Sequence, residues 1–466
     1  MANAISGLTS DTKRVLDIVK TISRHKVSQG MTPEKAVEIF KDLGPTYVKL
    51  GQILSMHPEI IPPEYCKALE CLRADGKMLV AAQIRDIISE EYGKPWNKVF
   101  KQIMPIPVGS ASIAQVHEAY LHDGTHVAIK VQRPDIYDTM ERDVAILKKA
   151  LSIVNTKFAG VVDLPDAIEQ MWLVAKEEMD FIREAENIKT VRKNTENISY
   201  IYCPKVYDEL TTKNVLVMEY IGGYDINDKE HLLADGYNIK EICTKFINNF
   251  IKQFAEDRFF HADPHPGNVR VQDGQIVWLD LGMMGYLTQK DADLVTVCMK
   301  SIFTNDYVGF ANAVLNICEH DPNIDMDKFY AAMKAYLNKY RVISMEDMID
   351  TVDIFKDLFN ISREFKIKVP GSMTMFWRSM GVMEGTVADL APDTDLVAII
   401  GKHLAAQAFG NTLAGSVLKG VTHRKLISGK PLSYNGHVQD DDDIELADQS
   451  DKDLDEIIRR ELGGAD

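Results

Sequence analysis

The feature that most constrains the fold is the stretch Phe260–Gly282, which reads FHADPHPGNVRVQDGQIVWLDLG. Asp273-Gly274 lies between two short apolar runs and predicts a β-hairpin, because Asp-Gly readily adopts the positive φ angles that a two-residue turn requires. Asp263 and Asn268 precede the hairpin and Asp280 follows it. The hairpin is therefore expected to bring together three side chains that bind cations or accept protons.

A lysine lies in a strand pattern about 130 residues upstream of this stretch. Alternating residues predict strands at 112–121 and 126–132, joined by a turn at Asp123-Gly124. The second strand contains Val127-Ala128-Ile129-Lys130, which matches the lysine strand of protein kinases. Alone the match has little specificity, because a lysine at a strand end is usually only solvated. It gains weight from its place upstream of the carboxylates, in a chain whose strands come before most of its helices.

Together the two sets match the parts that phosphoryl transfer requires. In kinase-like phosphotransferases one Asp faces the nucleophile, a lysine holds the phosphates of ATP, and an Asn and a second Asp bind Mg²⁺. We therefore predict that Asp263 positions water or a substrate hydroxyl, that Lys130 binds phosphate, and that Asn268 and Asp280 bind Mg²⁺. Positioning and charge neutralisation would supply most of the rate enhancement.

Other segments are expected to complete a nucleotide site. The strand at 214–220 and the following Gly222-Gly223 are similar to a hinge between two lobes, so the backbone of Glu219 and Ile221 is expected to bind adenine. A helix predicted over 164–193 carries several carboxylates, one of which must neutralise the lysine.

Several parts of an ordinary protein kinase are missing. The loop Pro107–Ser112 contains no G-x-G-x-x-G, and His261-Ala262-Asp263 lacks the usual arginine. No A-P-E sequence follows Asp280, and a helix cap predicted at Thr288 leaves no room for a long activation segment. These absences argue against a protein substrate and leave ATP and Mg²⁺ chemistry intact.

Two histidines four residues apart also suggest a zinc pair on a helix. Pro264 and Pro266 interrupt any helix that would carry His261 and His265, so we do not expect zinc here. His261 is instead expected to brace the loop.

Charge and hydropathy exclude some classes of protein. The net charge is −16. The segment from His437 onward contains 12 acidic and 3 basic residues, which predicts an acidic, disordered tail. Without a basic face the rest of the chain gives no reason to expect nucleic-acid binding. We see no N-terminal signal, and the longest uncharged run, 404–418, is too short and polar for a membrane span. We expect a cytoplasmic protein that contacts a membrane surface at most.

The N-terminal region is predicted to be helical. Residues 11–29 form a basic amphipathic pattern, which suits either an anionic membrane surface or, more commonly, packing on the domain. Thr32 is expected to cap a second helix that ends near Gly44. In the next helical pattern Lys49 and Gln52 would ordinarily face solvent.

With these residues in view, the chain resembles the UbiB/AarF family of atypical, protein-kinase-like proteins over about residues 40–395. Besides the residues above, the match includes the KxGQ motif Lys49-Leu50-Gly51-Gln52, an alanine-rich nucleotide loop at Ser110–His117, Glu178-x-Asp180, Glu184, and a C-terminal signature with Arg378-Ser379-Met380 and Glu384-Gly385. In one departure Gly109-Ser110 replaces alanines that the family usually has, and in another the paired C-terminal membrane helices of some relatives are absent.

The resemblance implies roles for these motifs. The KxGQ helix would fold over the site as a gate, with Lys49 contacting Glu178 and Asp180, and with Gln52 beside it. Lys130 would pair with Glu184. The loop over the phosphates would consist of Gly109, Ser110, Ala111 and Ser112. Such a gate would block protein substrates and favour ATP hydrolysis, or phosphorylation of a small molecule or lipid, in isoprenoid-quinone synthesis at a membrane with other lipid-biosynthetic enzymes.

We therefore predict an α+β, two-lobed, protein-kinase-like fold. Its parts would be a helical extension (1–103), an N-lobe (104–222), a mostly helical C-lobe (223–432) and the acidic tail (433–466). The expected function is a Mg-ATP-dependent ATPase or phosphotransferase. A small-molecule or lipid kinase and a nucleotide-binding scaffold without turnover stay open as alternatives.

Overall fold

The structure is a computed structural model that describes most of the chain. The described residues are 10–25, 30–55, 61, 63–69, 71–72, 78–111, 113–153, 164–341, 351–394, 396, 399–400 and 403. Ser112 of the predicted phosphate loop and the predicted acidic tail lie outside them.

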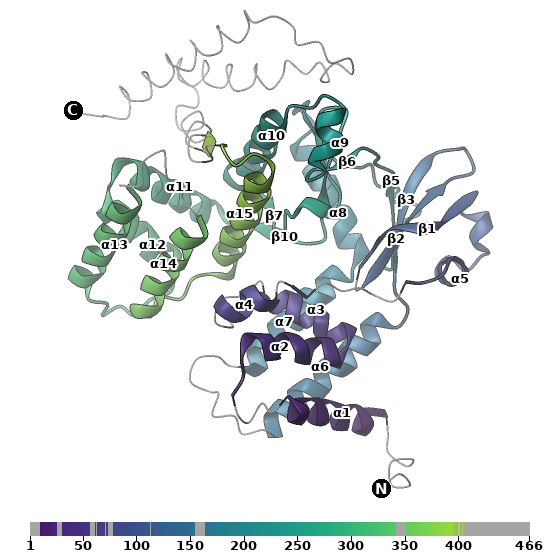
Figure 1. Cartoon of the computed structure of the whole chain (residues 1–466), viewed down its shortest axis with the longest axis horizontal. Helices are drawn as coiled ribbons and strands as arrows, with labels where there is room; N and C mark the ends of the chain where they lie inside the picture. Colours follow the sequence, from purple (N-terminus) through teal and green to yellow (C-terminus); the bar gives the residue numbers. More distant parts are fainter. Residues whose placement is uncertain are drawn as a thin grey trace, which may run out of the picture. The chain divides into compact units, whose positions relative to one another are not determined.

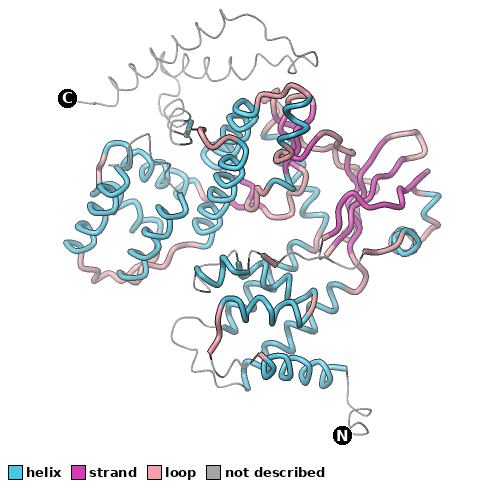
Figure 2. Tube along the Cα trace, viewed as in Figure 1, coloured by secondary structure: helices cyan, strands magenta, loops and turns pink. Residues whose placement is uncertain are grey.

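The chain divides into two compact units, whose helices and strands are labelled in Figure 1. Unit 1 comprises residues 1–190, 204–221 and 281–283, and unit 2 comprises 191–203, 222–280 and 284–466. Both units contain helices and strands, which confirms the predicted α+β class (Figure 2). The domain boundaries predicted at 103, 222 and 432 stay predictions.

An antiparallel sheet of four strands forms the β part of unit 1. Its order is β1 (Gln102–Ser110), β2 (Ala114–Tyr120), β3 (His126–Gln132) and β5 (Val215–Glu219). The predicted lysine strand is confirmed as β3, which is buried from Val127 to Gln132. Helix α5 (Ala81–Glu91) places Ile84 and Ile88 in the same apolar cluster as Ile129 of β3. This burial holds β3 rigidly in the middle of the sheet.

Besides α5, the described part of unit 1 contains the α-helices α1 (Ser10–Arg24), α2 (Pro33–Leu43), α3 (Pro45–Ser55), α4 (Pro63–Leu69), α6 (Ile136–Ile153), α7 (Leu164–Glu178) and the first part of α8 (Phe181–Asn194). The predicted cap of α2 is confirmed, because Thr32 Oγ1 accepts the Lys35 N–H at 3.3 Å. In α1, Ile18 is buried and Arg14 Nε donates to Asp143 Oδ1 of α6 at 3.0 Å. This face of α1 therefore packs on the domain, which is the commoner of the two alternatives.

The single helix expected over 164–193 is wrong, because the chain forms two helices there. Helix α7 ends at Glu178 and α8 begins at Phe181. Between them Asp180 Oδ1 accepts the N–H of Ile182 at 3.1 Å. A short acidic side chain that bonds to a nearby backbone N–H competes with the continuous helix and starts a new one.

Unit 2 contains two small sheets. One has the order β4 (Ile201–Tyr202), β9 (Gln275–Trp278), β8 (Val269–Gln272) and β6 (Tyr224–Asp225), and the other pairs β7 (Phe259–His261) with β10 (Met284–Tyr286). The predicted hairpin is confirmed: Gln272 pairs with Gln275, and Asp273 and Gly274 have φ angles of 50° and 75°. The strand expected at 199–206 is limited to β4.

Among its described residues, unit 2 has the α-helices α9 (Lys229–Ala234), α10 (Ile239–Lys252), α11 (Gln289–Thr304), α12 (Tyr307–Ile317), α13 (Met326–Arg341), α14 (Thr351–Glu364) and α15 (Gly371–Leu390). The predicted cap of α11 is confirmed, because Thr288 Oγ1 accepts the Asp291 N–H at 3.1 Å. The helix expected to run to Arg258 becomes a π-turn (Gln253–Asp257) and ends at Arg258 with φ 55°. Among the described helices, none is long and apolar enough to cross a bilayer.

Candidate functional site

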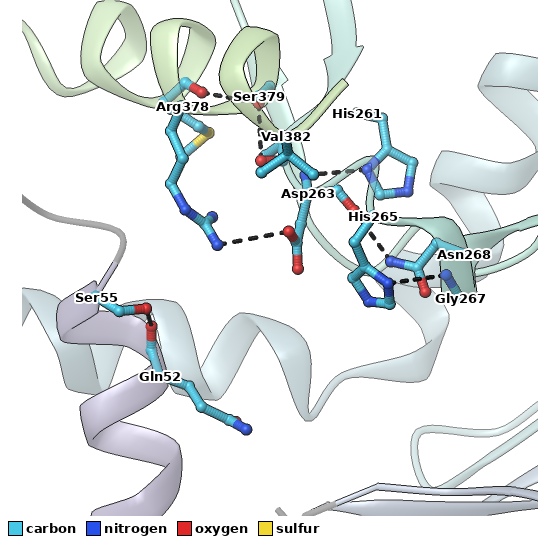
Figure 3. A network of polar contacts seen from close by, with 12 residues as sticks. Gln52, Ser55, His261, Asp263, His265, Gly267, Asn268, Arg378, Ser379 and Val382 are labelled. Atoms are coloured by element: carbon cyan, nitrogen blue, oxygen red, sulfur yellow. Dashed lines mark hydrogen bonds and ion pairs between the residues drawn. The ribbon is translucent and has the colours of Figure 1, made fainter. Parts of the chain in front are cut away.

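The loop between β7 and β8 carries Asp263 and Asn268 (Figure 3). Asn268 Nδ2 donates to the carbonyl oxygen of Asp263 at 3.1 Å, and the Asn268 N–H donates to the carbonyl of His265 at 2.9 Å. The N–H of Leu279, the residue before Asp280, donates to the carbonyl of Asn268 at 3.0 Å. The hairpin thus brings the three predicted residues of this unit together.

His261 braces this loop, as the sequence predicts. The Asp263 N–H donates to His261 Nδ1 at 3.0 Å, and Nε2 lies 2.6 Å from the carbonyl oxygen of Asp280. Because Nδ1 accepts a hydrogen bond, the ring proton resides on Nε2, which donates to the carbonyl oxygen of Asp280. The ring is buried, and burial lowers the pKa of His261 below its usual value, although Asp263 and Asp280 oppose this shift. A neutral imidazole therefore links the loop between β7 and β8 to the far end of the hairpin.

A buried chain of neutral hydrogen bonds supports His261. Gln253 Oε1 accepts the His261 N–H at 3.0 Å, and Gln253 Nε2 donates to Asn249 Oδ1 at 2.9 Å. Trp278 Nε1 of β9 donates to the same Asn249 oxygen at 2.8 Å. Gln253 starts the π-turn after α10, and such turns often occur at functional sites. Sequence reasoning missed these hydrogen bonds, although an asparagine among the apolar residues of α10, Asn249, was a signal visible in the sequence.

Helix α15 contributes a cation to the same loop. Arg378 Nη2 lies 3.4 Å from Asp263 Oδ1, and the adjacent Ser379 Oγ donates to the carbonyl of Ala262 at 2.7 Å. The sequence marks Arg378 and Ser379 only as part of a C-terminal signature. Their contact with the loop could not be predicted, because it joins residues more than 110 positions apart.

In unit 1 the predicted partner of the lysine is confirmed. Lys130 Nζ lies 2.9 Å from both carboxylate oxygens of Glu184, and the two residues are 9% and 3% exposed. The Lys130 ammonium also lies 5.4 Å from the centre of the Phe181 ring. A buried ammonium held by a bidentate carboxylate has a fixed position, which suits a group that must meet a phosphate.

The predicted phosphate loop is only partly a loop, which corrects the expectation. Gly109 and Ser110 belong to β1, where they pair with Val116 and Gln115 of β2. The side chain of Arg133 holds the end of this strand. Its Nη2 donates to Ser110 Oγ at 3.0 Å, and its Nε donates to the carbonyl of Ala111 at 2.9 Å. The strand β1 therefore ends at Ser110, and the Ala111 N–H donates to the carbonyl of Ala114 at 2.8 Å.

In the predicted hinge segment the N–H groups of Glu219 and Tyr220 are both occupied, and that of Tyr220 donates to the carbonyl of His126 at 3.3 Å. The Glu219 N–H donates to the carbonyl of Lys205 at 2.8 Å, and Glu219 Oε2 accepts the Lys205 N–H at 3.1 Å. An adenine at Glu219 would therefore meet its carbonyl oxygen. Ile221, the other predicted contact, is buried at the end of this segment.

The predicted gate residues are split between two tasks. Lys49 of α3 forms an ion pair with Glu178 at the end of α7, which confirms the Lys49–Glu178 contact that the resemblance implies, in place of the solvent-facing position that is ordinary for such a lysine. Asp180 does not join this pair and caps α8 instead. Gln52 Nε2 donates to the carbonyl of Leu72 at 2.7 Å and fixes α3 locally. A gating role for these residues stays a prediction.

The residues predicted to bind Mg²⁺ have suitable chemistry. With Asn268 Nδ2 bound to the Asp263 carbonyl, the side-chain oxygen of Asn268 is its group for a cation, and Asp280 supplies a carboxylate. Mg²⁺ prefers oxygen ligands and usually keeps waters and substrate phosphates beside one or two protein groups. In the described part of the chain no three His, Cys, Asp or Glu side chains form a metal cage. Two protein ligands therefore fit a metal that arrives with a nucleotide.

Comparisons with known proteins agree with this geometry. Residues 72–314 match the ABC1 atypical kinase-like domain, and residues 333–395 match the UbiB helical domain. These matches confirm the predicted kinase-like fold with a helical C-terminal part.

Individual relatives give the same picture. A protein from Clostridium pasteurianum, named only for its place in the 5′ region of hydrogenase 1, is 32% identical over 81% of this chain and 71% of its own length. The probable protein kinase UbiB of Tolumonas auensis is 30% identical over 77% of this chain and 67% of its own. The solved structure of Rv3197 with erythromycin, from Mycobacterium tuberculosis, has a TM-score of 0.53 at 19% identity and covers 82% of this chain and 97% of that one. At that identity the similarity concerns the fold alone.

Proposed function

The chain belongs to the UbiB/ABC1 family of atypical kinase-like proteins, and on that premise we propose that it is a Mg-ATP-dependent ATPase or phosphotransferase. The observation that carries the proposal is the braced loop of unit 2. There a buried neutral His261 holds the backbone of both Asp263 and Asp280. A loop fixed in this way has its catalytic carboxylates in place before any substrate binds, which is the main requirement for phosphoryl transfer.

Each side chain has a distinct task in this proposal. Lys130, positioned by Glu184, binds the α- and β-phosphates, and Glu219 and Ile221 bind adenine through their backbone. Asn268 and Asp280 hold Mg²⁺, which when bound neutralises charge on the phosphate oxygens. Asp263 orients water or a substrate hydroxyl toward the γ-phosphorus and accepts its proton.

We infer that the acceptor is water, a lipid or another small molecule, and that the protein works with lipid or quinone precursors and lipid-biosynthetic enzymes. Support comes from the short path after Asp280, where β10 and the cap of α11 follow directly and no long segment is available to bind a peptide. The exposed face of α1, with Val19 51% exposed and Lys20 beside it, would supply peripheral membrane contact.

The direct test is phosphate release from Mg-ATP by the purified protein, with and without anionic liposomes containing phenolic or isoprenoid lipids. Asp280→Asn is expected to lower turnover by about 10²-fold or more, because it removes the metal's carboxylate ligand. Asp293→Asn, on the exposed face of α11, is the matched control and should match wild type. Both variants should keep the wild-type melting temperature.

The outcomes separate the candidate functions. A phosphorylated lipid or small molecule would identify a kinase, and phosphate release alone would identify an ATPase. If Asp280→Asn kept full turnover in a folded protein, the metal assignment would be wrong. A wild-type protein that binds ATP and never releases phosphate with any lipid would be a nucleotide-binding scaffold, and the enzyme proposal would fail.

A further inference from the structure

Arg378 is a charged residue that uses few of its hydrogen-bond donors within the described part of the protein. Its guanidinium carries five N–H donors in a planar fork. Within the described part of the protein, Nη2 reaches Asp263 Oδ1 at 3.4 Å, and Nη1 is buried without an acceptor. The side chain is 20% exposed and that of Asp263 is 27% exposed.

The ion pair with Asp263 contributes too little to the stability of the fold to account for the presence of Arg378 at this position. A contact of 3.4 Å is long for a hydrogen bond, and an ion pair at this exposure contributes little to stability. A buried N–H without an acceptor is unfavourable. The local arrangement is therefore better suited to binding an anion than to holding the protein together.

The position of Arg378 is fixed by its neighbours on α15. Ser379 Oγ donates to the carbonyl of Ala262, one residue before Asp263. Phe376 stacks on Phe254 of the π-turn with ring centres 3.7 Å apart, and it meets Phe260 of β7 edge-on at 5.9 Å. Helix α15 is thus attached to the same two segments that carry the catalytic loop, so the guanidinium is held where Asp263 acts (Figure 3).

We propose that Arg378 is a catalytic residue of the phosphoryl-transfer step, and this inference rests on the proposed function. Its guanidinium binds the non-bridging oxygens of the phosphoryl group that is being transferred. Asp263 and Arg378 then form one unit, in which the carboxylate holds the nucleophile and the guanidinium holds the group under attack. The long contact in the ligand-free protein is expected, because catalytic hydrogen bonds often tighten only in the complex.

The step balances without further reactants. The oxygen of water or of the substrate hydroxyl forms a bond to the γ-phosphorus, and the bond from that phosphorus to the β–γ bridging oxygen breaks. The bridging oxygen leaves with the electron pair as part of ADP. The proton of the nucleophile passes to Asp263 and then to solvent. Arg378 neutralises charge on the equatorial oxygens while both bonds are partial.

The test compares Arg378→Ala and Arg378→Lys with wild type in Mg-ATP turnover. Arg378→Ala should lower kcat by about 10²- to 10³-fold and change KM for ATP by less than about 3-fold, because the contact forms mainly in the transition state. Arg378→Lys should recover only part of this loss, since an ammonium cannot bind two oxygens in the same plane. Arg363→Ala, at an exposed position near the end of α14, is the control and should behave as wild type.

A second measurement separates catalysis from folding. Guanidinium ion added at low millimolar concentration, well below its denaturing range, should raise the turnover of Arg378→Ala by at least about 10-fold. It should not raise the turnover of Asp280→Asn. Affinity for ADP with aluminium fluoride, which imitates the transferring group, should fall in Arg378→Ala, while affinity for ADP alone should not. A residue that only supports the fold would show neither effect.

The possible failures are distinguishable. If wild type turns over ATP and the folded Arg378→Ala variant does so equally well, the role of Arg378 is overturned and the proposed function stands. The same holds if kcat falls without rescue by guanidinium and without loss of affinity for the aluminium fluoride complex. If wild type itself shows no turnover, the proposed function fails and this inference fails with it.

Discussion

The two units hold their candidate site residues in place in different ways. In unit 1, ion pairs do this: buried Lys130 with Glu184, and half-buried Lys49 with Glu178. In unit 2, the residues around the loop use neutral groups, namely the imidazole of His261 and the amides of Gln253 and Asn249. Both arrangements fix a side chain that the proposed chemistry requires.

The difference follows from what each unit must hold. Lys130 must remain charged while buried, and only an opposite charge with good geometry offsets the loss of its water. The loop of unit 2 already carries the carboxylates Asp263 and Asp280, with the guanidinium of Arg378 beside Asp263, so a further charge at His261 would alter the electrostatics of this set. Neutral donors and acceptors can hold the backbone there without adding charge. The two units should therefore respond differently when one partner is removed.

The largest effect is expected when the ion pair of unit 1 is broken. Lys130→Met removes the ammonium that pairs with the buried Glu184 carboxylate, which should lower the free energy of unfolding by about 3–5 kcal/mol. Adding Glu184→Leu should restore most of this loss, because an apolar pair of similar volume no longer buries a charge. Amide hydrogen exchange of β3 and β5 as a function of urea concentration measures the change within unit 1.

Lys290→Met is the control for this experiment, since Lys290 is exposed at the start of α11. It should change the free energy of unfolding by less than about 0.5 kcal/mol. If Lys130→Met and the double variant were equally destabilised, packing by the lysine stem would be the cause, and the contrast between the units would lose its electrostatic basis.

A smaller effect is expected in the neutral chain of unit 2. Gln253→Leu removes the acceptor of the buried His261 N–H and should cost about 2 kcal/mol, which is typical for one unsatisfied buried dipole. The loss should be visible as faster hydrogen exchange in β7 with β3 unchanged. Gln289→Leu, at an exposed position in α11, is the control. Equal losses from Gln253→Leu and Lys130→Met would contradict the proposed difference between neutral and charged burial.

Local sequence signals predicted much of the fold. Asp273-Gly274 requires positive φ angles and predicted the hairpin, and Thr32 predicted a helix start, because both depend on neighbouring residues only. The break at Asp180 was missed because the apolar pattern continues across it, and only the bond from its carboxylate to Ile182 interrupts the helix. Gly109 and Ser110 were expected in a loop because small residues favour turns. Pairing with β2 and the contact from Arg133 override that preference.

The candidate site divides in the same way. Asp263, Asn268 and Asp280 were predicted to lie together because a single hairpin joins them. The pairing of Lys130 with Glu184 came from the family resemblance, because several acidic residues on the same helices were equally good by charge alone. Arg378 could not be placed on Asp263, since nothing local records which face of α15 meets the loop. The roles of all these residues in turnover stay predictions.

The smallest expected effect concerns pH and separates His261 from exposed histidines. Burial lowers the pKa of His261, so as pH falls below about 6.5 the unfolded chain binds a proton before the folded protein does. Stability from this residue is therefore fully present above pH 6.5 and is lost as pH falls toward the lowered pKa. Between pH 6.5 and 5.5 the free energy of unfolding should fall by at most about 1.4 kcal/mol through His261. Buried His117 in unit 1, whose pKa is also lowered by burial, should behave alike.

His231 is the internal control, because it is exposed and hydrogen-bonds to Asp228, which raises its pKa. In an NMR titration its ring signals should therefore move above pH 6.5, while those of His261 stay unchanged until lower pH. Hydrogen exchange of β7 should quicken as pH falls below 6.5, after correction for the intrinsic pH dependence of exchange. A His261 signal that titrates at or above 6.5 would mean that a charged ring braces the loop. The brace on the backbone of Asp263 and Asp280 would then carry a charge, as the pairs of unit 1 do, and the contrast between the two units would disappear.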